Sequence, residues 1–305
     1  MREGFIEDGL HDHLRTHKIS RAEYYQIYYP RHDLLTGEII HYKSKEFYFD
    51  NDFNTKENLR NWLLHLSKEE QIAHCKNLLS KRKQQKNLKY SPSQVELRTV
   101  MIPAINYLET ILDYYKVCEE LGFANKYKKI TGKLPVYPLE ESKRKIIIDS
   151  RERTPLHFYN FKTRIEKLDE GDYALEDEDE FGCVIERKSL GDFYGTLASY
   201  KNQDRFVREL ERAKSKNLGV VVLVESDLNN VYTFKDDPSV NGSVKASGHY
   251  VFHIMRDLIQ KFQNIQFLFV KNRNTSARVI EALFQSRGEY RNIDLQLAMD
   301  KGELI

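Results

Sequence analysis

The chain has 305 residues, the length of about two ordinary domains. Its 48 basic and 46 acidic residues leave a net charge of +2, so any contact with nucleic acid must come from a local basic patch. Aromatic residues make up 12% of the chain, which is typical of folded rather than disordered proteins. The three cysteines, Cys75, Cys118 and Cys183, are too few and too scattered for a disulfide framework or a Cys-x-x-Cys zinc site.

Nothing in the sequence has the length of a membrane span, because the longest nearly apolar run covers only residues 219–224. The first residues also lack the apolar core of a signal peptide. We therefore expect an intracellular protein with no membrane partner. Its place would be the bacterial cytoplasm, a phage-infected cell, or the nucleus if the source is eukaryotic.

Short helices dominate the prediction for residues 1–132. Ser20 and Glu23 have the spacing of a capping box, which predicts that a helix begins there. Residues 36–42 are expected to form a turn and a strand that pairs with 47–49. Apolar residues at helical spacing predict one helix over 59–66 and another that begins at 91 and continues to 112. The helix that follows, over 115–121, is expected to end at Gly122.

A basic run over residues 76–90 contains no acidic residue. Such a run is either a solvated helix face or a surface that binds phosphate groups. We predict that residues 1–132 bind DNA or a partner protein, and that 133–143, with two prolines, form a linker. The predicted DNA-binding residues are Lys81, Arg82, Lys83, Lys86 and Lys89.

Strands and helices alternate in the second half, which predicts an α/β domain around a mixed sheet over 144–290, followed by a tail over 291–305. Short apolar or alternating runs predict five strands, at 145–149, 171–175, 181–186, 218–224 and 265–270. Helical periodicity predicts helices at 204–216, 249–262 and 275–284.

Acidic residues stand at the ends of three of these strands. Asp149 ends the first strand, Asp172 begins the second, and Glu186 lies near the end of the third. Lys188 follows two residues later and therefore shares a face with Glu186. If the strands are adjacent, three carboxylates and an amine meet at one rim of the sheet.

Such a cluster of carboxylates repels itself unless a cation neutralises it. Carboxylate oxygens suit Mg²⁺ or Mn²⁺. An ion of this kind lowers the pKa of a bound water and stabilises the charge that develops on a phosphate under attack. The pattern therefore indicates metal-assisted hydrolysis of phosphodiester bonds.

The same residues resemble the XPF family of structure-selective endonucleases, within the restriction-endonuclease-like PD-(D/E)xK superfamily. The strings that carry the resemblance are IDSRE at 148–152, GDY at 171–173 and IERKSLGD at 185–192, which follow the family signature GDx(n)ERKx(3)D. The resemblance covers residues 144–290 and implies a restriction-endonuclease-like mixed sheet flanked by helices. A mainly helical domain would precede it.

The resemblance also implies roles for individual residues. Mg²⁺ or Mn²⁺ would be bound by Asp149, Asp172 and Glu186, assisted by the carbonyl of Arg187. Lys188 would be the catalytic lysine. Positioning and phosphate contact would come from Glu152, Arg187 and Asp192.

Family resemblance further implies a homodimer or heterodimer formed through the nuclease domain. The apolar helix that carries Tyr250, Ile254 and Leu258 is the candidate contact. Such nucleases often carry a tandem helix-hairpin-helix module and a helicase domain, and we expect neither here. DNA would therefore be bound by the N-terminal half, by a partner chain or by a second copy. Segments 14–29 and 91–123 resemble modules of phage and homing-endonuclease DNA-binding proteins, which suggests a phage or mobile-element origin.

The predicted function is a divalent-metal-dependent endonuclease that acts on branched, flapped or forked DNA in repair, recombination or replication. One alternative is a sequence-directed or nonspecific duplex endonuclease that uses the same site. A second alternative is a non-catalytic DNA-binding scaffold with a vestigial nuclease fold. The intact acidic residues and lysine argue against the second alternative.

Overall fold

The computed structural model describes residues 16–18, 24, 27, 59–60, 63–129, 132–133, 144–176, 182–234, 246–286 and 288–305. The chain divides into two compact units, one of residues 1–81 with 101–103 and the other of residues 82–100 with 104–305. The strands predicted at 36–49 lie outside the described residues, as does most of the helix predicted after Ser20 and of the linker at 133–143. None of the described helices is long and apolar enough to cross a membrane.

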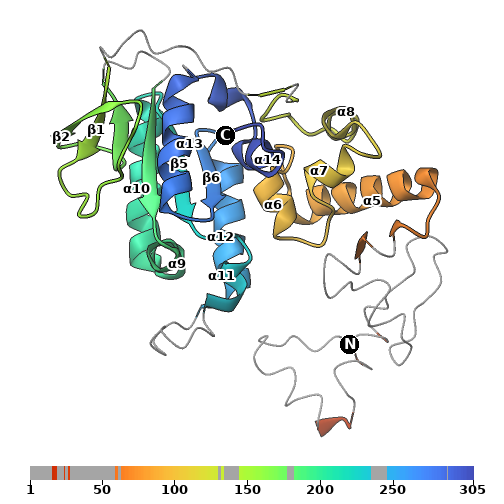
Figure 1. The fold of residues 1–305 in the computed structure, drawn as a ribbon. Coiled ribbons are helices and arrows are strands. Elements are labelled where there is room, and N and C mark those ends of the chain that lie inside the picture. Colours follow the sequence, from red (N-terminus) through yellow and green to blue (C-terminus); the bar gives the residue numbers. More distant parts are fainter. Residues whose placement is uncertain are drawn as a thin grey trace. The chain divides into compact units, whose positions relative to one another are not determined.

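A mixed sheet of six strands, in the order β2-β1-β3-β4-β5-β6, forms the centre of the larger unit (Figure 1). Strand β3 is antiparallel to both of its neighbours, and the other pairs are parallel. The predicted α/β class is therefore confirmed, and all five predicted strands are present. The strands are β1 (Lys145–Asp149), β2 (Lys162–Glu166), β3 (Tyr173–Leu175), β4 (Cys183–Lys188), β5 (Gly219–Glu225) and β6 (Ile265–Val270).

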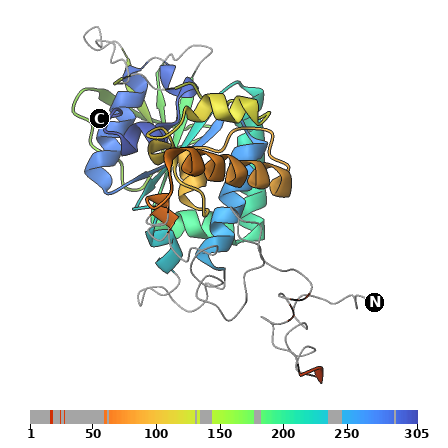
Figure 2. The same cartoon turned by 90° about the vertical axis from the view of Figure 1, so that its right-hand side faces the viewer.

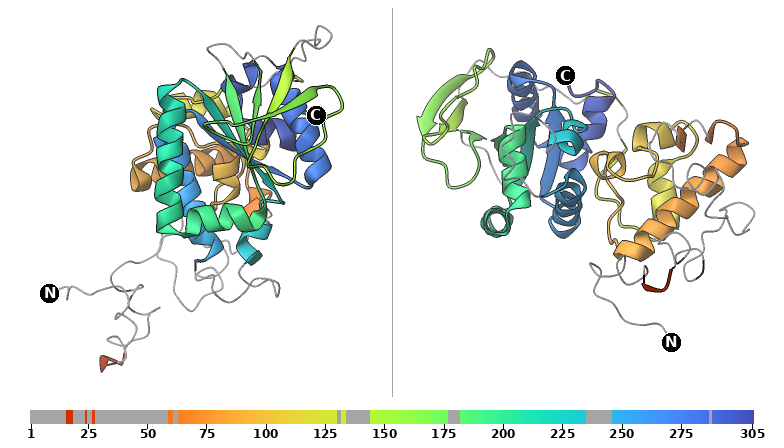
Figure 3. Two further views of the ribbon diagram at one scale, coloured as in Figure 1. Left: turned by 90° about the vertical axis from the view of Figure 1, so that its left-hand side faces the viewer. Right: turned by 90° about the horizontal axis from the view of Figure 1, so that it is seen from below.

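Helices cover both faces of this sheet, as the two views of Figure 3 show. Alternation along β4 sends Ile185 to the face covered by α13 and α14, and Val184 to the face covered by α9, α10 and α12. Strand β5 lies between both layers and is buried almost throughout, which explains its continuous run of Val and Leu. The helices are α9 (Leu190–Ala198), α10 (Tyr200–Ser215), α11 (Asn230–Thr233), α12 (Gly248–Lys261), α13 (Arg273–Gln285) and α14 (Leu295–Asp300), with a short 3₁₀ helix, η3, at Glu289–Asn292.

The helical segment before the sheet comprises α5 (Lys68–Lys86), α6 (Gln94–Arg98), α7 (Ile105–Leu108) and α8 (Tyr114–Glu120). The prediction of one helix from 91 to 112 was wrong, because the structure has two short helices there. Ser93 begins α6 with a complete capping box, and Pro103 stands between the helices. Proline lacks an N–H and disfavours helical geometry in the residue before it, so the helix cannot continue. Gly122 ends α8 as predicted, with a φ of +76°.

Helices α6 to α8 belong to the same compact unit as the sheet (Figure 2). The backbone N–H of Gln94 donates to Asp294 at 2.6 Å, and its side-chain amide donates to Asp300 at 2.7 Å. The ammonium of Lys126 donates to three backbone carbonyls around the end of α12 and the start of β6, at 3.0–3.3 Å. Helix α14, beyond the last predicted helix, supplies the partners of Gln94 because Asp294 caps it and Asp300 ends it.

Candidate active site

The three strands that carry the predicted acidic residues are neighbours in the sheet, as the site hypothesis required. Ile148 of β1 pairs with Tyr173 of β3, and Tyr173 pairs with Ile185 of β4. Each predicted acid lies one residue from these pairs, and its side chain therefore leaves the sheet on the opposite face, toward α9 and α10. The acids concerned are Asp149, Asp172 and Glu186.

Glu186 and Lys188 form the centre of this rim. The ammonium of Lys188 lies 2.8 Å from a carboxylate oxygen of Glu186, and both side chains are mostly buried. The same ammonium lies over the ring of Phe206 from α10, 5.6 Å from the centroid. Lys188 is thus held in one orientation, with its charge beside the carboxylates.

Asp172 adds a second carboxylate to the same rim. It accepts a 2.8 Å hydrogen bond from the backbone N–H of Arg187. Burial and the neighbouring Glu186 carboxylate raise the pKa of Asp172 to about 7. The two carboxylates of Asp172 and Glu186 therefore repel each other and are not fully neutralised by nearby cationic side chains. Oxygen donors of this kind fit a hard divalent cation.

Asp149 has a different environment. Its carboxylate accepts hydrogen bonds of 2.7 Å from the side chain of Arg151 and from the backbone N–H of Leu168. The guanidinium of Arg151 holds the pKa of Asp149 at about 2. Among the residues that the structure describes, no three His, Cys, Asp or Glu side chains are grouped so that they could hold a metal ion. Metal binding by all three predicted ligands stays a prediction, and Asp172 and Glu186 are the pair that fits.

Arg187 and Glu152 meet each other on the opposite face of β4. The guanidinium of Arg187 lies 2.9 Å from Glu152 and 3.0 Å from Glu225, and only 11% of its side chain is exposed. Glu225, at the end of β5, was not among the predicted site residues. The structure therefore brings Arg187 and Glu152 together, and two carboxylates already hold the guanidinium. Glu152 is also an electrostatic neighbour of Asp172.

Asp192 lies in the first turn of α9, directly after β4. Its carboxylate accepts a 2.7 Å hydrogen bond from the hydroxyl of Ser189, and that hydroxyl accepts one of 3.1 Å from the backbone N–H of Asp192. Ser189 is the N-cap of α9. The described contacts of Asp192 therefore stabilise the start of α9, the helix that follows β4.

The predicted DNA-binding residues do not share one environment. Lys83 donates to the backbone carbonyl of Leu121 at 2.7 Å, just beyond α8, so its ammonium is engaged within the fold. Arg82 is partly buried. The side chains exposed to solvent are Lys81, Lys86 and Lys89.

Glu209 of α10 is a carboxylate at this rim that the sequence analysis missed. The electrostatic neighbours of its side chain include Glu186 and Lys188. The sequence feature that could have pointed to Glu209 is its position on the predicted helix, next to the buried residues Phe206, Leu210 and Ala213.

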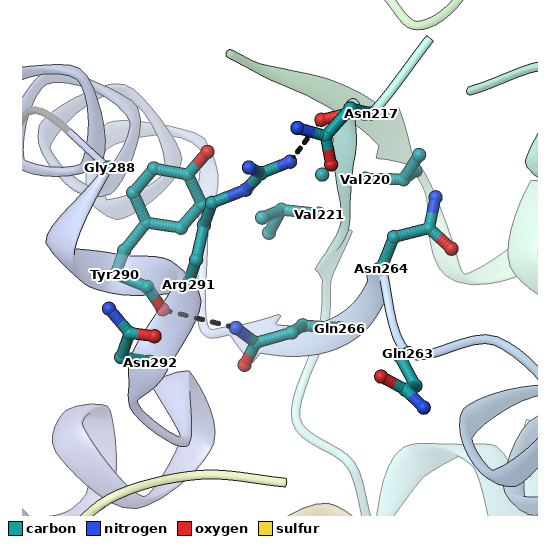
Figure 4. Close-up of a pocket in the computed structure, with 11 residues that line it drawn as sticks. Asn217, Val220, Val221, Gln263, Asn264, Gln266, Gly288, Tyr290, Arg291 and Asn292 are labelled. Carbon is teal, nitrogen blue, oxygen red and sulfur yellow. Dashed lines mark hydrogen bonds between the residues drawn. The ribbon is translucent and has the colours of Figure 1, made fainter. Parts of the chain in front are cut away.

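A cavity of about 320 Å³ lies at the ends of β5 and β6 where these strands begin, away from the Asp172–Glu186 rim (Figure 4). Amide side chains provide much of its lining, and Arg291 donates across it to the backbone carbonyl of Asn217 at 2.5 Å. Its lining residues include no carboxylate, so the cavity offers no ligands of the kind that the Asp172–Glu186 rim presents.

The predicted dimer contact lies on α12. Tyr250 is 43% exposed, whereas Leu258 is buried. A groove between α10 and α12 is lined by Ile254 and Leu258 together with the exposed Tyr200. Dimer formation through this helix stays a prediction.

The raised pKa of Asp172 predicts how the stability of the metal-free protein depends on pH. The folded state keeps this proton up to about pH 7, whereas an exposed aspartate loses it near pH 4. The folded state binds more protons than the unfolded state in that interval. The stability contributed by protonated Asp172 is therefore fully present below pH 4 and is lost as the pH rises through 7. The free energy of unfolding, measured with urea in EDTA, should fall between pH 5 and pH 8. We expect this fall to be smaller by about 1–3 kcal/mol in the Asp172→Asn variant than in the wild type. An equal loss in both proteins would contradict the prediction.

Comparison with known proteins places this rim within a recognised domain. Residues 142–283 match the family model of the ERCC4 domain. This match confirms the predicted XPF-family nuclease domain for that part of the chain. A comparison with curated protein sequences finds no relative of the chain.

Two solved structures are similar to about half of the chain. XPF from Aeropyrum pernix shares 20% identity and a TM-score of 0.33, covering 46% of this chain and 64% of that one. The same protein in complex with DNA shares 21% identity and a TM-score of 0.34, covering 46% of this chain and 63% of that one. The chain thus spans less than two thirds of the length of either structure.

Proposed function

Because residues 142–283 form an XPF-family nuclease domain, we propose that the chain is a divalent-metal-dependent DNA endonuclease that prefers branched, flapped or forked DNA. The observation that carries the proposal is the rim of Asp172, Glu186 and Lys188, which two adjacent strands present beside α10. Two carboxylates that share one lysine at a partly buried rim are the groups that metal-assisted phosphodiester hydrolysis uses.

Asp172 and Glu186 would hold the cation, and Asp149 is the third candidate ligand because it ends the neighbouring strand. When bound, the ion supplies a water of lowered pKa and neutralises charge on the phosphate. Asp172 must lose its proton to serve as a ligand, so we expect cation binding to weaken below pH 7.

Lys188 would act on the phosphate itself. Its ammonium lies 2.8 Å from Glu186 and is positioned by the Phe206 ring. In hydrolysis a water oxygen forms a bond to phosphorus, and the bond from phosphorus to the leaving sugar oxygen breaks. Lys188 would stabilise the negative charge that gathers on the non-bridging oxygens during this exchange.

DNA docking would use the basic run at the end of α5. The exposed Lys81, Lys86 and Lys89 are suited to phosphate contacts, which position DNA without reading its sequence. Such contacts make the affinity fall as the salt concentration rises. A preference for branched DNA would then come from the shape of the substrate.

A cleavage panel tests the proposed activity. The full chain is incubated with Mg²⁺ and end-labelled flap, fork and linear duplexes of identical sequence. We expect flap or fork DNA to be cut faster than the linear duplex, and EDTA to stop the reaction. The Glu186→Gln variant, prepared in the same way, controls for contaminating nucleases.

Equal cutting of all three substrates would favour a nonspecific duplex endonuclease, and cutting at one position in every substrate would favour a sequence-directed enzyme. Absence of cutting with Mg²⁺ and with Mn²⁺, while DNA is still bound, would favour the scaffold.

A further inference from the structure

Glu209 lies at the middle of α10, on the side that faces the sheet. Phe206, three residues before it, packs under the ammonium of Lys188. Arg212, three residues after it, donates to Glu170 at 3.2 Å, next to the turn that enters β3. Residues three apart share a helix face, so Glu209 lies between these two contacts and points at the rim of the sheet.

The contacts of Glu209 agree with this placement. Its partly buried carboxylate lies close enough to the backbone N–H of Gly171 for that group to lower the pKa of Glu209. Gly171 has a φ of +72°, and a side chain there would approach Val184 of β4 to 2.8 Å, so the turn can pass this close to β4 only as glycine. The next residue is Asp172, and Glu209 thus touches the turn that delivers this carboxylate.

Charge also links Glu209 to the site. Burial and the Glu186 carboxylate raise the pKa of Glu209, while Lys188 and the Gly171 N–H oppose that shift. Asp172, Glu186 and Glu209 are thus electrostatic neighbours at one rim with Lys188, and Asp172 and Glu209 are also neighbours of the Arg151 guanidinium. The rim carries an excess of negative charge that a divalent cation would reduce.

We propose that Glu209 is a positioning residue of the nuclease site, a fourth carboxylate whose charge strengthens the binding of a divalent cation by Asp172 and Glu186. The inference rests on the proposed function and deepens it. Glu209 acts from α10 in two ways: its carboxylate lies against the Gly171 turn, and its charge adds to the field at the rim. Residues that support metal ligands in this way change metal affinity when they are altered.

Binding of Mn²⁺ to the metal-free full chain, measured by electron paramagnetic resonance without DNA, tests the proposal. Glu209→Gln keeps the size and the acceptor for Gly171 but removes the charge, and we expect it to weaken Mn²⁺ binding by about 10- to 100-fold. Glu209→Asp keeps the charge and should bind Mn²⁺ more tightly than the Gln variant. Glu211→Gln is the matched control, because Glu211 is exposed on the same helix and pairs only loosely with Lys261, at 3.9 Å. It should leave Mn²⁺ binding unchanged.

Two results would overturn the inference while leaving the proposed function intact. One is a Gln variant that binds Mn²⁺ as tightly as the wild type while the wild type cuts DNA. The other is an Asp variant no better than the Gln variant, because the charge would then be irrelevant. A wild-type chain that neither binds Mn²⁺ nor cuts DNA would instead overturn the proposed function, and the inference with it.

Discussion

Replacing Lys188 with methionine is expected to slow DNA cleavage by about 10²- to 10³-fold, the range typical of removing one group that stabilises charge in the transition state. Methionine keeps much of the length and packing over the Phe206 ring but removes the ammonium that lies 2.8 Å from Glu186. Single-turnover cleavage of the best substrate of the panel, at saturating protein, measures the effect on the chemical step rather than on binding.

Lys214→Met provides the matched control, because Lys214 is an exposed lysine of α10 outside the rim. This variant should cut like the wild type. Fluorescence anisotropy should show that Lys188→Met still binds DNA, and circular dichroism that it is folded. A folded Lys188→Met variant that cuts within tenfold of the wild-type rate would remove this lysine from the proposed mechanism.

The largest expected effect on stability belongs to Arg187. Its guanidinium lies between Glu152 and Glu225, whose side chains are 9% and 15% exposed. Arg187→Met leaves these two carboxylates without their cation, and removal of one partner of a buried ion pair costs about 3–5 kcal/mol. Urea unfolding at pH 7 should show a loss of this size in the free energy of unfolding.

Arg164 offers a close comparison on the surface. It also lies between two glutamates, Glu166 and Glu176, but 46% of its side chain is exposed. Arg164→Met should cost less than about 1 kcal/mol because water screens the pairs. Adding Glu152→Gln and Glu225→Gln to Arg187→Met should recover much of the lost stability. Similar losses for the two single arginine variants would show that burial does not govern the Arg187 cluster.

The strands of the α/β domain were predictable because their local pattern determines them. The predicted bounds of β1 and β6 are those of the structure, since each is a short apolar run that is buried on folding. Strand β2 was not predicted: it is exposed along its length, so no apolar pattern marks it. The break between α6 and α7 was missed because the apolar spacing continues across Pro103.

The site was predictable only in part. The Asp172–Glu186–Lys188 rim follows from strand alternation once β3 and β4 pair. The partners contributed by distant elements could not be read from local spacing. Glu225 reaches Arg187 across 38 residues of sequence, and Glu209 comes from a helix whose rotation about the sheet only tertiary packing determines. The hydrogen bond from Arg151 to Asp149 joins residues two apart, but the sequence alone does not determine which partner a carboxylate faces.

The bonds from Gln94 and Lys126 to Asp294 and to the start of β6 make the α/β domain dependent on residues that precede its first strand. A fragment of residues 144–305 would leave the Asp294 carboxylate, which is only 2% exposed, without the backbone N–H of Gln94 that donates to it. The part of the chain that satisfies the polar groups of this fold therefore begins before the segment that matches the ERCC4 domain.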